Sequence, residues 1–448
     1  MTVEELKSLI ASGAIDTVLV AAPDKCGRFV GKRYTGTDFV ESALGHGSHG
    51  CNYLMAVDIN MDPQDGFKLV SWDQGFGDFA MTPDLSTLRA LPWQPGAALV
   101  ICDLNQEDGS PVAEAPRNVL RRAITALAEA GCEAFFASEL EMFVYHTDYP
   151  TAFKSGYRDL KPVSDYRIDY HIMQPLREED LFRRIRNELS AAGIPIENTK
   201  GEWGIGQHEV NMKYAPPLEM ADRHILFKQG CKEIAQQTGR SLTFMAKPFA
   251  GEAGNSCHIH VSLFRDGKNA FWDAGKGGGS LLFRQFLGGL IKYCRELCYF
   301  FAPTINSYKR FEKWSWAPTR QAWSYDNRTV AFRVVGKGQS FRIENRTPGG
   351  DANPYMAYSA MLAAGLAGIR ENLDCGDVYK GNAYVDDTLA EMPHTLRGAV
   401  ALLRESALAK EFFGADVMEH HAHTGSLEAD AFDRAVTDWE RQRYFEQI

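Results

Sequence analysis

Residues 341–346 read Phe341-Arg342-Ile343-Glu344-Asn345-Arg346. Side chains in a β-strand alternate between two faces, so Arg342, Glu344 and Arg346 share one face. A carboxylate between two guanidinium groups suits phosphate, or a metal–phosphate complex, better than it suits a hydrophobic core. A solvated strand with two surface ion pairs would have the same pattern. The stretch therefore predicts a strand and leaves open whether it belongs to a site.

A second strand is expected over Ala134–Tyr145, where Glu139 and Glu141 lie side by side on one face. Like charges at this spacing repel unless a cation lies between them. The alternative is an edge strand protected by inward-pointing charge. The flanks are strongly apolar and favour a buried strand.

A third strand is expected over Ser256–Phe264, where His258, His260 and Ser262 lie opposite an apolar face. One histidine is more often a satisfied structural residue than a ligand. Two histidines on one face beside a hydroxyl make a better site candidate.

A fourth strand is expected over Gln207–Tyr214, where Gln207, Glu209 and Asn211 share a face. Upstream, Glu202 lies in a glycine-rich loop, whose glycines let the backbone bend. A lone glutamate in such a loop is usually solvated. Glu202 is therefore a candidate ligand only because the other acidic residues are predicted nearby.

Together these strands predict a site for a hard divalent cation. Glutamate oxygens suit Mg²⁺ or Mn²⁺, and one imidazole is compatible with Mn²⁺. No paired-cysteine spacing indicates zinc. The candidate ligands are five glutamates (Glu139, Glu141, Glu202, Glu209 and Glu344) and one histidine, either His258 or His260.

The segment from residue 309 to 346 is locally cationic in a chain whose net charge is −10. It contains six arginines and only three acids. Clustered arginines beside metal-binding carboxylates suit phosphoryl transfer, which needs a charge clamp and little covalent chemistry. Residue chemistry alone therefore predicts a metal-dependent enzyme that uses ATP or another phosphate compound.

With its motifs in order, the chain resembles the glutamine synthetase family. The matching pieces are SELE (138–141), EWGIGQHE (202–209), CHIHVS (257–262), NSYKR (306–310), NRT (327–329), FRIENR (341–346), NPY (353–355) and the closing TDWERQRYF (437–445). The resemblance covers nearly the whole chain. It implies an α+β fold with a small β-grasp domain over 1–107 and a large catalytic domain over 108–448. The catalytic domain would hold a curved antiparallel sheet flanked by helices.

The resemblance also implies a role for each matching residue. Two or more Mg²⁺ or Mn²⁺ ions would lie in each site, one beside L-glutamate and one beside the phosphates of ATP. The first ion would be held by Glu141, Glu202 and Glu209, and the second by Glu139, His258 and Glu344. His260 and Ser262 would contact the nucleotide, and the phosphate clamp would be Arg328, Arg333 and Arg342. Arg310 and Arg346 would serve the glutamate carboxylates and the transferring phosphate, and Gly254 would line the glutamate pocket.

The family reaction forms γ-glutamyl phosphate, from which an amine displaces phosphate. Enzymes that make glutamine carry a flap glutamate shortly after NSYKR, and Trp316 stands in that place. Their N-terminal acidic loop corresponds to residues 50–54, which contain no acid. These departures resemble the γ-glutamyl-amine ligases, such as γ-glutamylmethylamide synthetase and the γ-glutamylpolyamine enzymes.

A small monoamine such as methylamine, ethylamine or ethanolamine is therefore the favoured acceptor. Trp316, with Trp314 and Tyr53, is expected to line its entrance. Glutamine synthesis with relocated ammonium contacts, a γ-glutamylpolyamine synthetase and a non-catalytic family member stay as alternatives.

The acidic balance of the chain argues against nucleic acid or an anionic membrane as a partner. Nine scattered cysteines indicate reduced thiols of the cytoplasm, and no apolar run reaches membrane-spanning length. MTVEELKSLIAS is an amphipathic helix, not a signal peptide. The family resemblance implies a ring-shaped oligomer, most plausibly a dodecamer.

The remaining helices are predicted from periodicity and from Pro and Gly signals. They span 116–131, 178–192, 219–238, 281–300 and 355–372, the last packing closely on its neighbours. Residues 105–111 form a polar hinge, and Gly275–Gly279 forms a flexible turn. His420, His421 and His423 are assigned to a solvated loop. The sequence around Tyr379 does not match a nucleotidylated loop.

Overall fold

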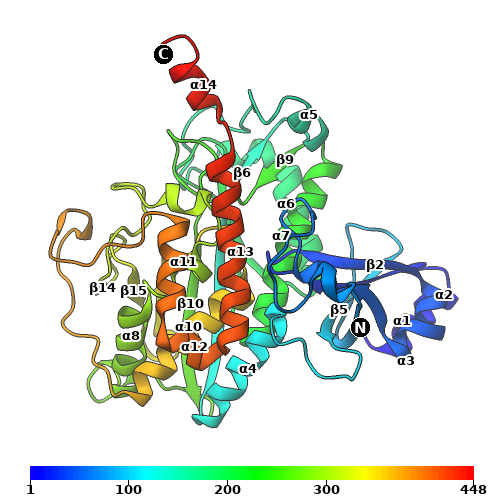
Figure 1. Cartoon of the computed structure of the whole chain (residues 1–448), viewed down its shortest axis with the longest axis horizontal. Helices are drawn as coiled ribbons and strands as arrows, with labels where there is room; N and C mark the ends of the chain where they lie inside the picture. Colours follow the sequence, from blue (N-terminus) through cyan, green and yellow to red (C-terminus); the bar gives the residue numbers. More distant parts are fainter.

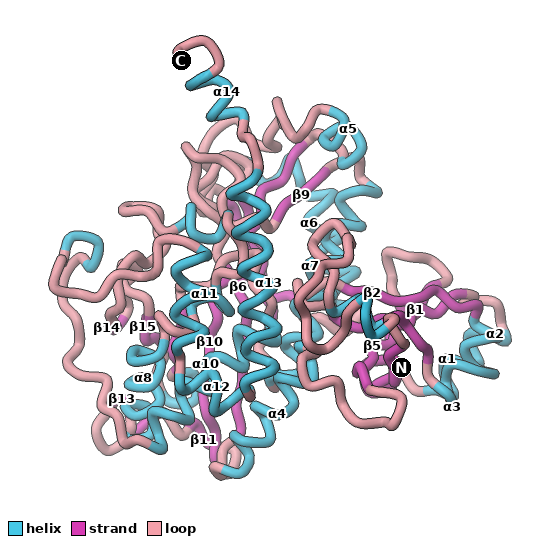
Figure 2. Tube along the Cα trace, viewed as in Figure 1, coloured by secondary structure: helices cyan, strands magenta, loops and turns pink.

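Two β-sheets organise the computed structural model, which describes residues 1–448 apart from the side chain of Gln174. A five-stranded sheet lies within residues 17–105 and a nine-stranded sheet within 133–345. In Figure 1 the first sheet lies at the right, in blue and cyan, and helices surround the second. Figure 2 shows the same division by element type. The arrangement confirms the expected α+β class.

The first sheet has the strand order β2-β1-β5-β4-β3. Its central pair, β1 and β5, is parallel, and the other pairs are antiparallel. This is the β-grasp arrangement expected from the sequence. The strands are β1 (Thr17–Pro23), β2 (Phe29–Thr35), β3 (Ser48–Cys51), β4 (Asp78–Ala90) and β5 (Ala97–Asn105). The short helices beside it are α1 (Val3–Ala11), α2 (Gly36–Asp38) and α3 (Leu44–His46), with a π-helical turn over Phe39–Ala43.

The second sheet has the order β14-β15-β16-β10-β6-β8-β7, with β9 paired to β6 and β11 to β10. The four strands predicted from sequence are the four consecutive strands β16, β10, β6 and β8. All pairs are antiparallel except β14 with β15. The strands are β6 (Glu133–Tyr145), β7 (Ile196–Gly201), β8 (Gln207–Met212), β9 (Ser241–Thr243), β10 (Cys257–Arg265), β11 (Lys268–Asn269), β14 (Trp323–Tyr325), β15 (Phe332–Val335) and β16 (Arg342–Asn345).

Helices cover this sheet, and α10 lies almost wholly buried among them, in contact with α8, α4 and α7. A Cβ atom on Gly289 of α8 would lie 2.0 Å from the carbonyl oxygen of Ala364, so glycine lets the two helices meet backbone to backbone. The helices are α4 (Pro116–Glu129), α5 (Tyr149–Lys154), α6 (Glu179–Ala191), α7 (Pro217–Gln237), α8 (Leu281–Tyr293), α9 (Cys298–Phe301), α10 (Pro354–Arg370), α11 (Leu396–Glu405), α12 (Ala407–Phe413), α13 (Ala415–Arg434) and α14 (Asp438–Tyr444). Short 3₁₀ turns span Asn52–Met55, Trp72–Gln74, Gln174–Glu178, Asn306–Arg310, Gly338–Ser340 and Ala383–Val385.

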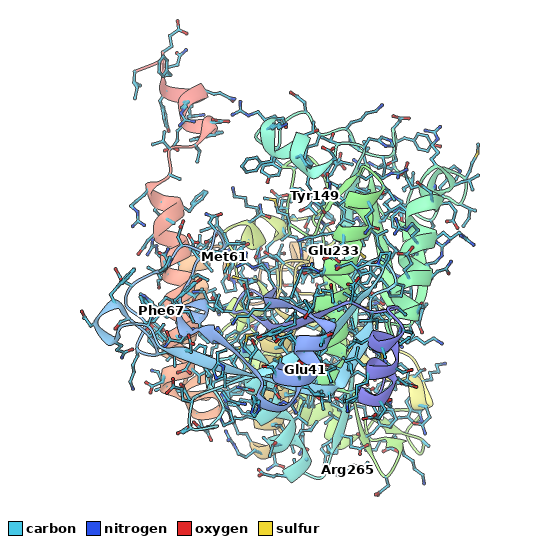
Figure 3. All side chains as sticks on the ribbon, turned by 90° about the vertical axis from the view of Figure 1, so that its right-hand side faces the viewer. Glu41, Met61, Phe67, Tyr149, Glu233 and Arg265 are labelled. Carbon is cyan, nitrogen blue, oxygen red and sulfur yellow. The ribbon has the colours of Figure 1, made fainter. Side chains whose placement is uncertain are left out.

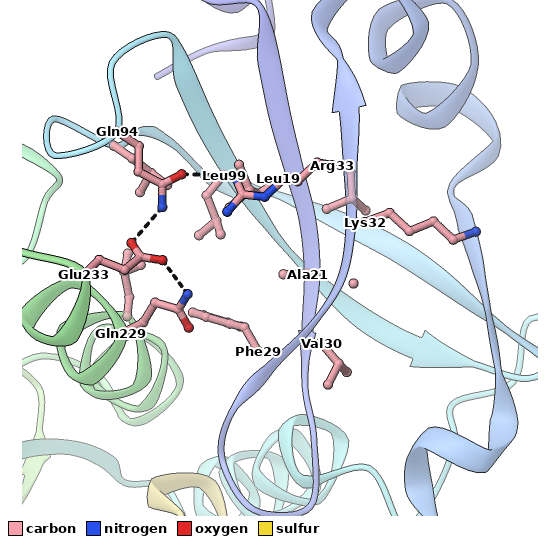
Figure 4. Close-up of a pocket in the computed structure, with 14 residues that line it drawn as sticks. Leu19, Ala21, Phe29, Val30, Lys32, Arg33, Gln94, Leu99, Gln229 and Glu233 are labelled. Atoms are coloured by element: carbon pink, nitrogen blue, oxygen red, sulfur yellow. Dashed lines mark hydrogen bonds between the residues drawn. The ribbon is translucent and has the colours of Figure 1, made fainter. Parts of the chain in front are cut away.

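Helix α7 ties the first sheet to the second. The carboxylate of Glu233 accepts hydrogen bonds from the amides of Gln94 and Gln229, each at 2.7 Å, and from the indole of Trp93 at 2.6 Å (Figure 4). The guanidinium of Arg33 on β2 in turn donates to Gln94 at 3.0 Å. The β-grasp sheet is therefore anchored to the helix layer by a polar network.

Two expectations about secondary structure are wrong. The predicted helix over 281–300 breaks into α8 and α9, with a turn over residues 294–297. No glycine or proline stands in that turn, so the sequence carries no breaking signal there. In contrast, Gly275–Gly279 is a turn as expected; it ends in β13 (Gly278–Gly279), which pairs with β12 (Trp272–Asp273).

The histidines assigned to a solvated loop lie in α13 instead, and His420 and His421 are buried. Val417, Met418 and Ala422 give this helix its own apolar face, which packs on its neighbours. The ring of Phe67, labelled in Figure 3, contacts His420 at a centroid distance of 4.8 Å. The three histidines are thus part of the packing between α13 and the first domain.

The end of the chain leaves this packed body. Helix α14 projects away from the rest of the molecule in Figures 1 and 2. Trp439, Phe445 and Ile448 are exposed along it. Among the described residues, no helix is both long and apolar enough to cross a membrane.

Candidate active site

The register of four strands brings the predicted chemical faces into one row. Glu139 on β6 pairs with His258 on β10, and Glu141 pairs with Glu209 on β8. Glu344 on β16 pairs with His260. Because side chains opposite each other in a sheet point the same way, residues far apart in sequence converge on one side of the sheet.

One group of ligand atoms comes from Glu141, Glu209 and His258, which lie within 4.8 Å of one another and are buried. Glu202 approaches from the loop after β7. The ammonium of Lys200 contacts Glu202 directly and lies 3.6 Å from Glu209. Glu202 therefore belongs to the same acidic cluster as Glu209, because the ammonium of Lys200 lies beside both carboxylates.

A second group comes from Glu139, His258 and Glu344, again within 4.8 Å. Nδ1 of His258 lies 3.4 Å from Glu139 and 3.6 Å from Glu344. His258 thus stands between the two groups, whereas the sequence assigned it to the second alone.

The carboxylates differ in pKa because their neighbours differ. Burial raises the pKa of Glu344, but His258 and Arg346 outweigh it and hold the pKa at about 2. Burial also opposes ionisation of Glu139, yet His260 and His258 keep its pKa well below the ordinary range. Glu209 has a raised pKa because it is buried near Glu139. Buried like charges of this kind are relieved by a bound cation.

The donor set fits a hard divalent cation. It offers converging carboxylate oxygens and one imidazole, which suits Mg²⁺ or Mn²⁺. No cysteine takes part: all nine thiols are free, and none belongs to the two ligand groups found among the described side chains. The residues present are therefore compatible with the predicted metal.

Three arginines line the cavity above these carboxylates: Arg328, Arg333 and Arg346. Arg346 and Arg333 donate to Glu344 at 2.6 and 2.9 Å. Arg346 also donates to the carbonyl of Trp316 at 3.2 Å. These guanidinium groups place positive charge directly beside the carboxylates of the cavity.

Arg310 lies behind the wall of the cavity and is 1% exposed. It donates to the carbonyls of Arg346, Thr347 and Pro348 at 3.1, 3.1 and 2.6 Å. A Cβ atom added to Gly254 would lie 2.6 Å from the side chain of Arg310, so only glycine at position 254 leaves room for Arg310. Gly254 lines the cavity and Arg310 supports it from behind.

Three other predicted residues stand farther along the sheet. His260 is held by Glu139 at 2.8 Å and receives a hydrogen bond from Arg342 at 3.1 Å. Ser262 follows on β10 and is half-buried. None of the three is part of the cavity lining, which the nearer residues form.

The cavity has a volume of about 520 Å³. Trp316 lines it and contacts Trp203 edge to face, with ring centroids 6.2 Å apart. Trp314 instead contacts Tyr384, and Tyr53 contacts Phe76 in the first domain. Of the three aromatic residues expected at the entrance, this chain places only Trp316 in its own cavity.

The sequence analysis missed several lining residues, among them Asp169, Tyr170, Lys200 and Trp203. Lys200 could have been found from the sequence. It precedes Glu202 by two residues on an extended segment, so the two side chains lie on the same face. Trp203 stands inside a quoted motif. Asp169 and Tyr170 lie in an irregular loop, where no periodicity marks them.

Comparison with known proteins agrees with this geometry. Residues 113–444 match the family "Glutamine synthetase, catalytic domain". Over 447 residues the chain is 50% identical to gamma-glutamylethanolamide synthetase of Streptomyces coelicolor, covering 100% of this chain and 96% of that protein. It is 35% identical to glutamate–isopropylamine ligase of a Pseudomonas species, covering 99% and 98%. The solved structure of GmaS with ADP superimposes with a TM-score of 0.86 at 28% identity, covering 98% and 99%.

Proposed function

Because the chain belongs to the glutamine synthetase family, it is an ATP- and divalent-metal-dependent ligase, and we propose ethanolamine or a similarly small primary amine as its acceptor. The reaction joins the γ-carboxylate of L-glutamate to the amine and gives a γ-glutamylamide, ADP and phosphate. ATP first phosphorylates the γ-carboxylate, and the amine then displaces phosphate from γ-glutamyl phosphate.

The observation that carries the choice of acceptor is Trp316 in the lining of the cavity. An indole favours a carbon-bearing amine through burial and, while the amine is still charged, through a cation–π contact. Burial contributes roughly 0.8 kcal/mol per CH₂, enough to favour a two-carbon amine several-fold over ammonium. The names of the Streptomyces and Pseudomonas relatives support small alkylamine and alkanolamine acceptors.

We assign roles to the chain's residues on the same basis. Glu141, Glu202 and Glu209 would hold one ion and Glu139, His258 and Glu344 another, either Mg²⁺ or Mn²⁺. When bound, these ions neutralise phosphate charge and polarise the γ-carboxylate. Arg328, Arg333 and Arg346 bind anionic oxygens of the nucleotide and substrate, while His260, Ser262 and Arg342 serve the nucleotide farther along the sheet. Arg310 and Gly254 shape the glutamate pocket, and Trp316 with Trp203 excludes water from the acyl phosphate.

A diamine is a weaker candidate. Its distal ammonium needs a carboxylate. Glu312, which lies in the segment before Trp316, is paired with Lys247 at 3.0 Å and does not line the cavity. Ammonium has no carbon to bury against an indole, so it gains only the cation–π contact. A non-catalytic protein has no physical need to keep six repelling ligands in one place.

We further propose a ring oligomer, most simply a dodecamer, in which a neighbour's first domain completes each site. The exposed apolar side chains on the projecting helix α14 support self-association. The position of Tyr53 in the first domain, outside its own chain's cavity, is consistent with a role in a neighbour's site.

We also propose a domain boundary at residues 107/108 and the cytoplasm as location, the latter because all nine cysteines are free thiols.

The proposal is tested by following ADP formation with glutamate, ATP and Mg²⁺ in the presence and absence of ethanolamine. Ethanolamine-dependent turnover is expected, and Glu141→Ala should abolish it while the circular dichroism spectrum is kept. Activity of Glu141→Ala at the wild-type level would refute the metal assignment. Light scattering that finds an active monomer would refute the ring.

A further inference from the structure

A second cavity lies between the first domain and the helix layer, and its volume of about 610 Å³ exceeds that of the active-site cavity. Its walls are the loop between β1 and β2, helices α7 and α13, and the segment around residues 299–306. It shares no lining residue with the active-site cavity. The assigned reaction makes no use of it.

Two lysines in its lining, the buried Lys25 and the half-buried Lys228, have no carboxylate partner. Lys25 is 7% exposed, and its ammonium lies 4.4 Å above the ring of Phe67. Lys228 donates to the carbonyl of Gly350 at 2.8 Å. Among the described side chains, no carboxylate lies within 4.0 Å of either ammonium group, whereas Arg28 of the same lining is paired with Asp24.

Burial costs free energy for an ammonium that lacks a counter-charge. It lowers the pKa of Lys25 to about 8, and the pKa of Lys228 likewise to about 8, with Lys232 adding to the effect on Lys228. An anion bound between these groups would reverse that cost.

The acids of the lining form no ion pair with either lysine, although Asp58 raises the pKa of Lys25 and Asp351 that of Lys228. Asp351 accepts from the hydroxyls of Thr304 and Ser307 at 2.7 and 2.6 Å. Asp58 accepts from two backbone amides of its own turn, at 2.8 and 2.9 Å. Glu428 has a raised pKa, because it is partly buried and faces Asp58. Each lysine therefore lacks a direct ion pair, and burial still outweighs the nearby acids in setting its pKa.

Apolar side chains complete the lining, including Ile225, Phe244, Tyr299 and Leu427. A cavity of this size with cationic and apolar walls matches the usual character of a small-molecule site. We propose that it binds a small organic anion, with a carboxylate or phosphate group held by Lys25 and Lys228 and its carbon atoms against Tyr299 and Phe244.

This cavity and the active site share a wall. Lys228 holds the carbonyl of Gly350, while the amide of Gly350 donates to Asn255 at 3.0 Å. Asn255 follows Gly254, and Arg310 holds the neighbouring carbonyl of Pro348 at 2.6 Å. A ligand that engages Lys228 therefore acts on the loop behind the glutamate pocket, and we expect it to change the KM for glutamate.

Calorimetry on the whole enzyme tests the site, with ADP, Mg²⁺ and glutamate saturating the active site. The probes are succinate, for a carboxylate, and glycerol 2-phosphate, for a phosphate. At least one should bind the wild type saturably, and Lys25→Met and Lys228→Met should each weaken binding about tenfold or more, the loss of one strong charge contact. Lys276→Met, which removes an exposed lysine outside this cavity, should bind as the wild type does.

Failure of both probes to bind the wild type would overturn the proposal, as would equal binding by both cavity variants and the wild type. If Lys228→Met does not fold, crystals of the wild type are soaked with whichever probe binds in calorimetry. Electron density for the probe beside Lys25 or Lys228 supports the site, and density only at the active-site arginines refutes it. In the activity assay the probe should change the KM for glutamate in the wild type but not in Lys25→Met. An unchanged KM despite binding would overturn the link to the active site.

Discussion

The indole rings of Trp203 and Trp316 meet edge to face at a centroid distance of 6.2 Å in the lining of the active-site cavity. Both rings are partly exposed, at 42% and 47%, so they border solvent on one side and the cavity on the other. Under the proposed function, an incoming amine would pass these two rings before it reached the acyl phosphate. This pair links the structure to acceptor choice.

Replacing Trp316 by glutamate should shift acceptor preference toward ammonium. The change introduces a carboxylate that attracts a small cation and removes the apolar surface that favours carbon. We expect kcat/KM for ethanolamine to fall about tenfold or more relative to that for ammonium. Steady-state rates with both amines at saturating glutamate and ATP measure this ratio, and Trp316→Phe, which keeps an aromatic wall, is the control. An unchanged ranking in Trp316→Glu would remove this position from acceptor choice.

Replacing Asp169 by asparagine should weaken amine binding selectively. Asp169 is exposed and lines the cavity, yet it belongs to neither group of ligand atoms. Amines arrive charged at neutral pH, so an exposed carboxylate attracts them, most strongly at low ionic strength. The KM for ethanolamine is expected to rise several-fold, with the KM for glutamate unchanged. Equal increases in both constants would indicate general disruption of the cavity instead.

Lys200 competes with a metal ion for Glu202 and Glu209. Its ammonium contacts the first carboxylate and lies 3.6 Å from the second, with the ring of Tyr170 4.6 Å away. Replacing it by methionine removes the competing charge, and Mn²⁺ should then bind about tenfold more tightly. Electron paramagnetic resonance of free Mn²⁺ measures this directly and independently of turnover. Lys200→Arg, which keeps the charge, should bind Mn²⁺ as the wild type does; the same affinity in all three proteins would contradict the prediction.

Without metal, Lys200→Met should also be less stable than the wild type. Glu202 and Glu209 then lose the ammonium group that lies beside both of them. The melting temperature of the chelated variant should fall, and saturating Mn²⁺ should restore it. A metal-free variant as stable as the metal-free wild type would show that Lys200 is not needed to balance this cluster.

The four strands of the site could be predicted from sequence because each alternates between an apolar and a chemical face. Glu139, Glu141 and His258 owe their convergence to antiparallel register, which follows once those strands are neighbours. The histidines of α13 could not be assigned in the same way. Their burial depends on packing against Phe67, a contact across more than three hundred residues. Local composition carries no trace of such a contact.

The site residues that the sequence did not predict are those placed by irregular loops or by attraction to nearby charges. Asp169 and Tyr170 reach the cavity through an irregular segment that has no periodicity to follow. Lys200 appears in the acidic cluster because unbalanced carboxylates attract a cation, a property of the assembled site. The shared wall at Gly350 is likewise a product of tertiary packing, since Lys228 and Asn255 both hydrogen-bond to the backbone of this one residue.

The buried His421 should make the protein less stable in mild acid. Burial lowers its pKa from 6.5 to about 4. Between these values the unfolded chain binds a proton that the folded chain does not, so the free energy of unfolding falls as pH decreases from about 6.5 to 4. The full effect is on the order of 3 kcal/mol. Urea unfolding at several pH values should show a flatter dependence in His421→Gln over this window. His46→Gln, which alters an exposed histidine, should keep the wild-type slope, and an identical slope in His421→Gln would contradict the assignment.

The most direct test of the account is a competition between amines. Ethanolamine and ammonium are supplied at equal concentration with glutamate, ATP and Mg²⁺, and the products are identified by mass spectrometry. The account predicts that γ-glutamylethanolamide dominates and that glutamine is the minor product. Glutamine as the main product would contradict it.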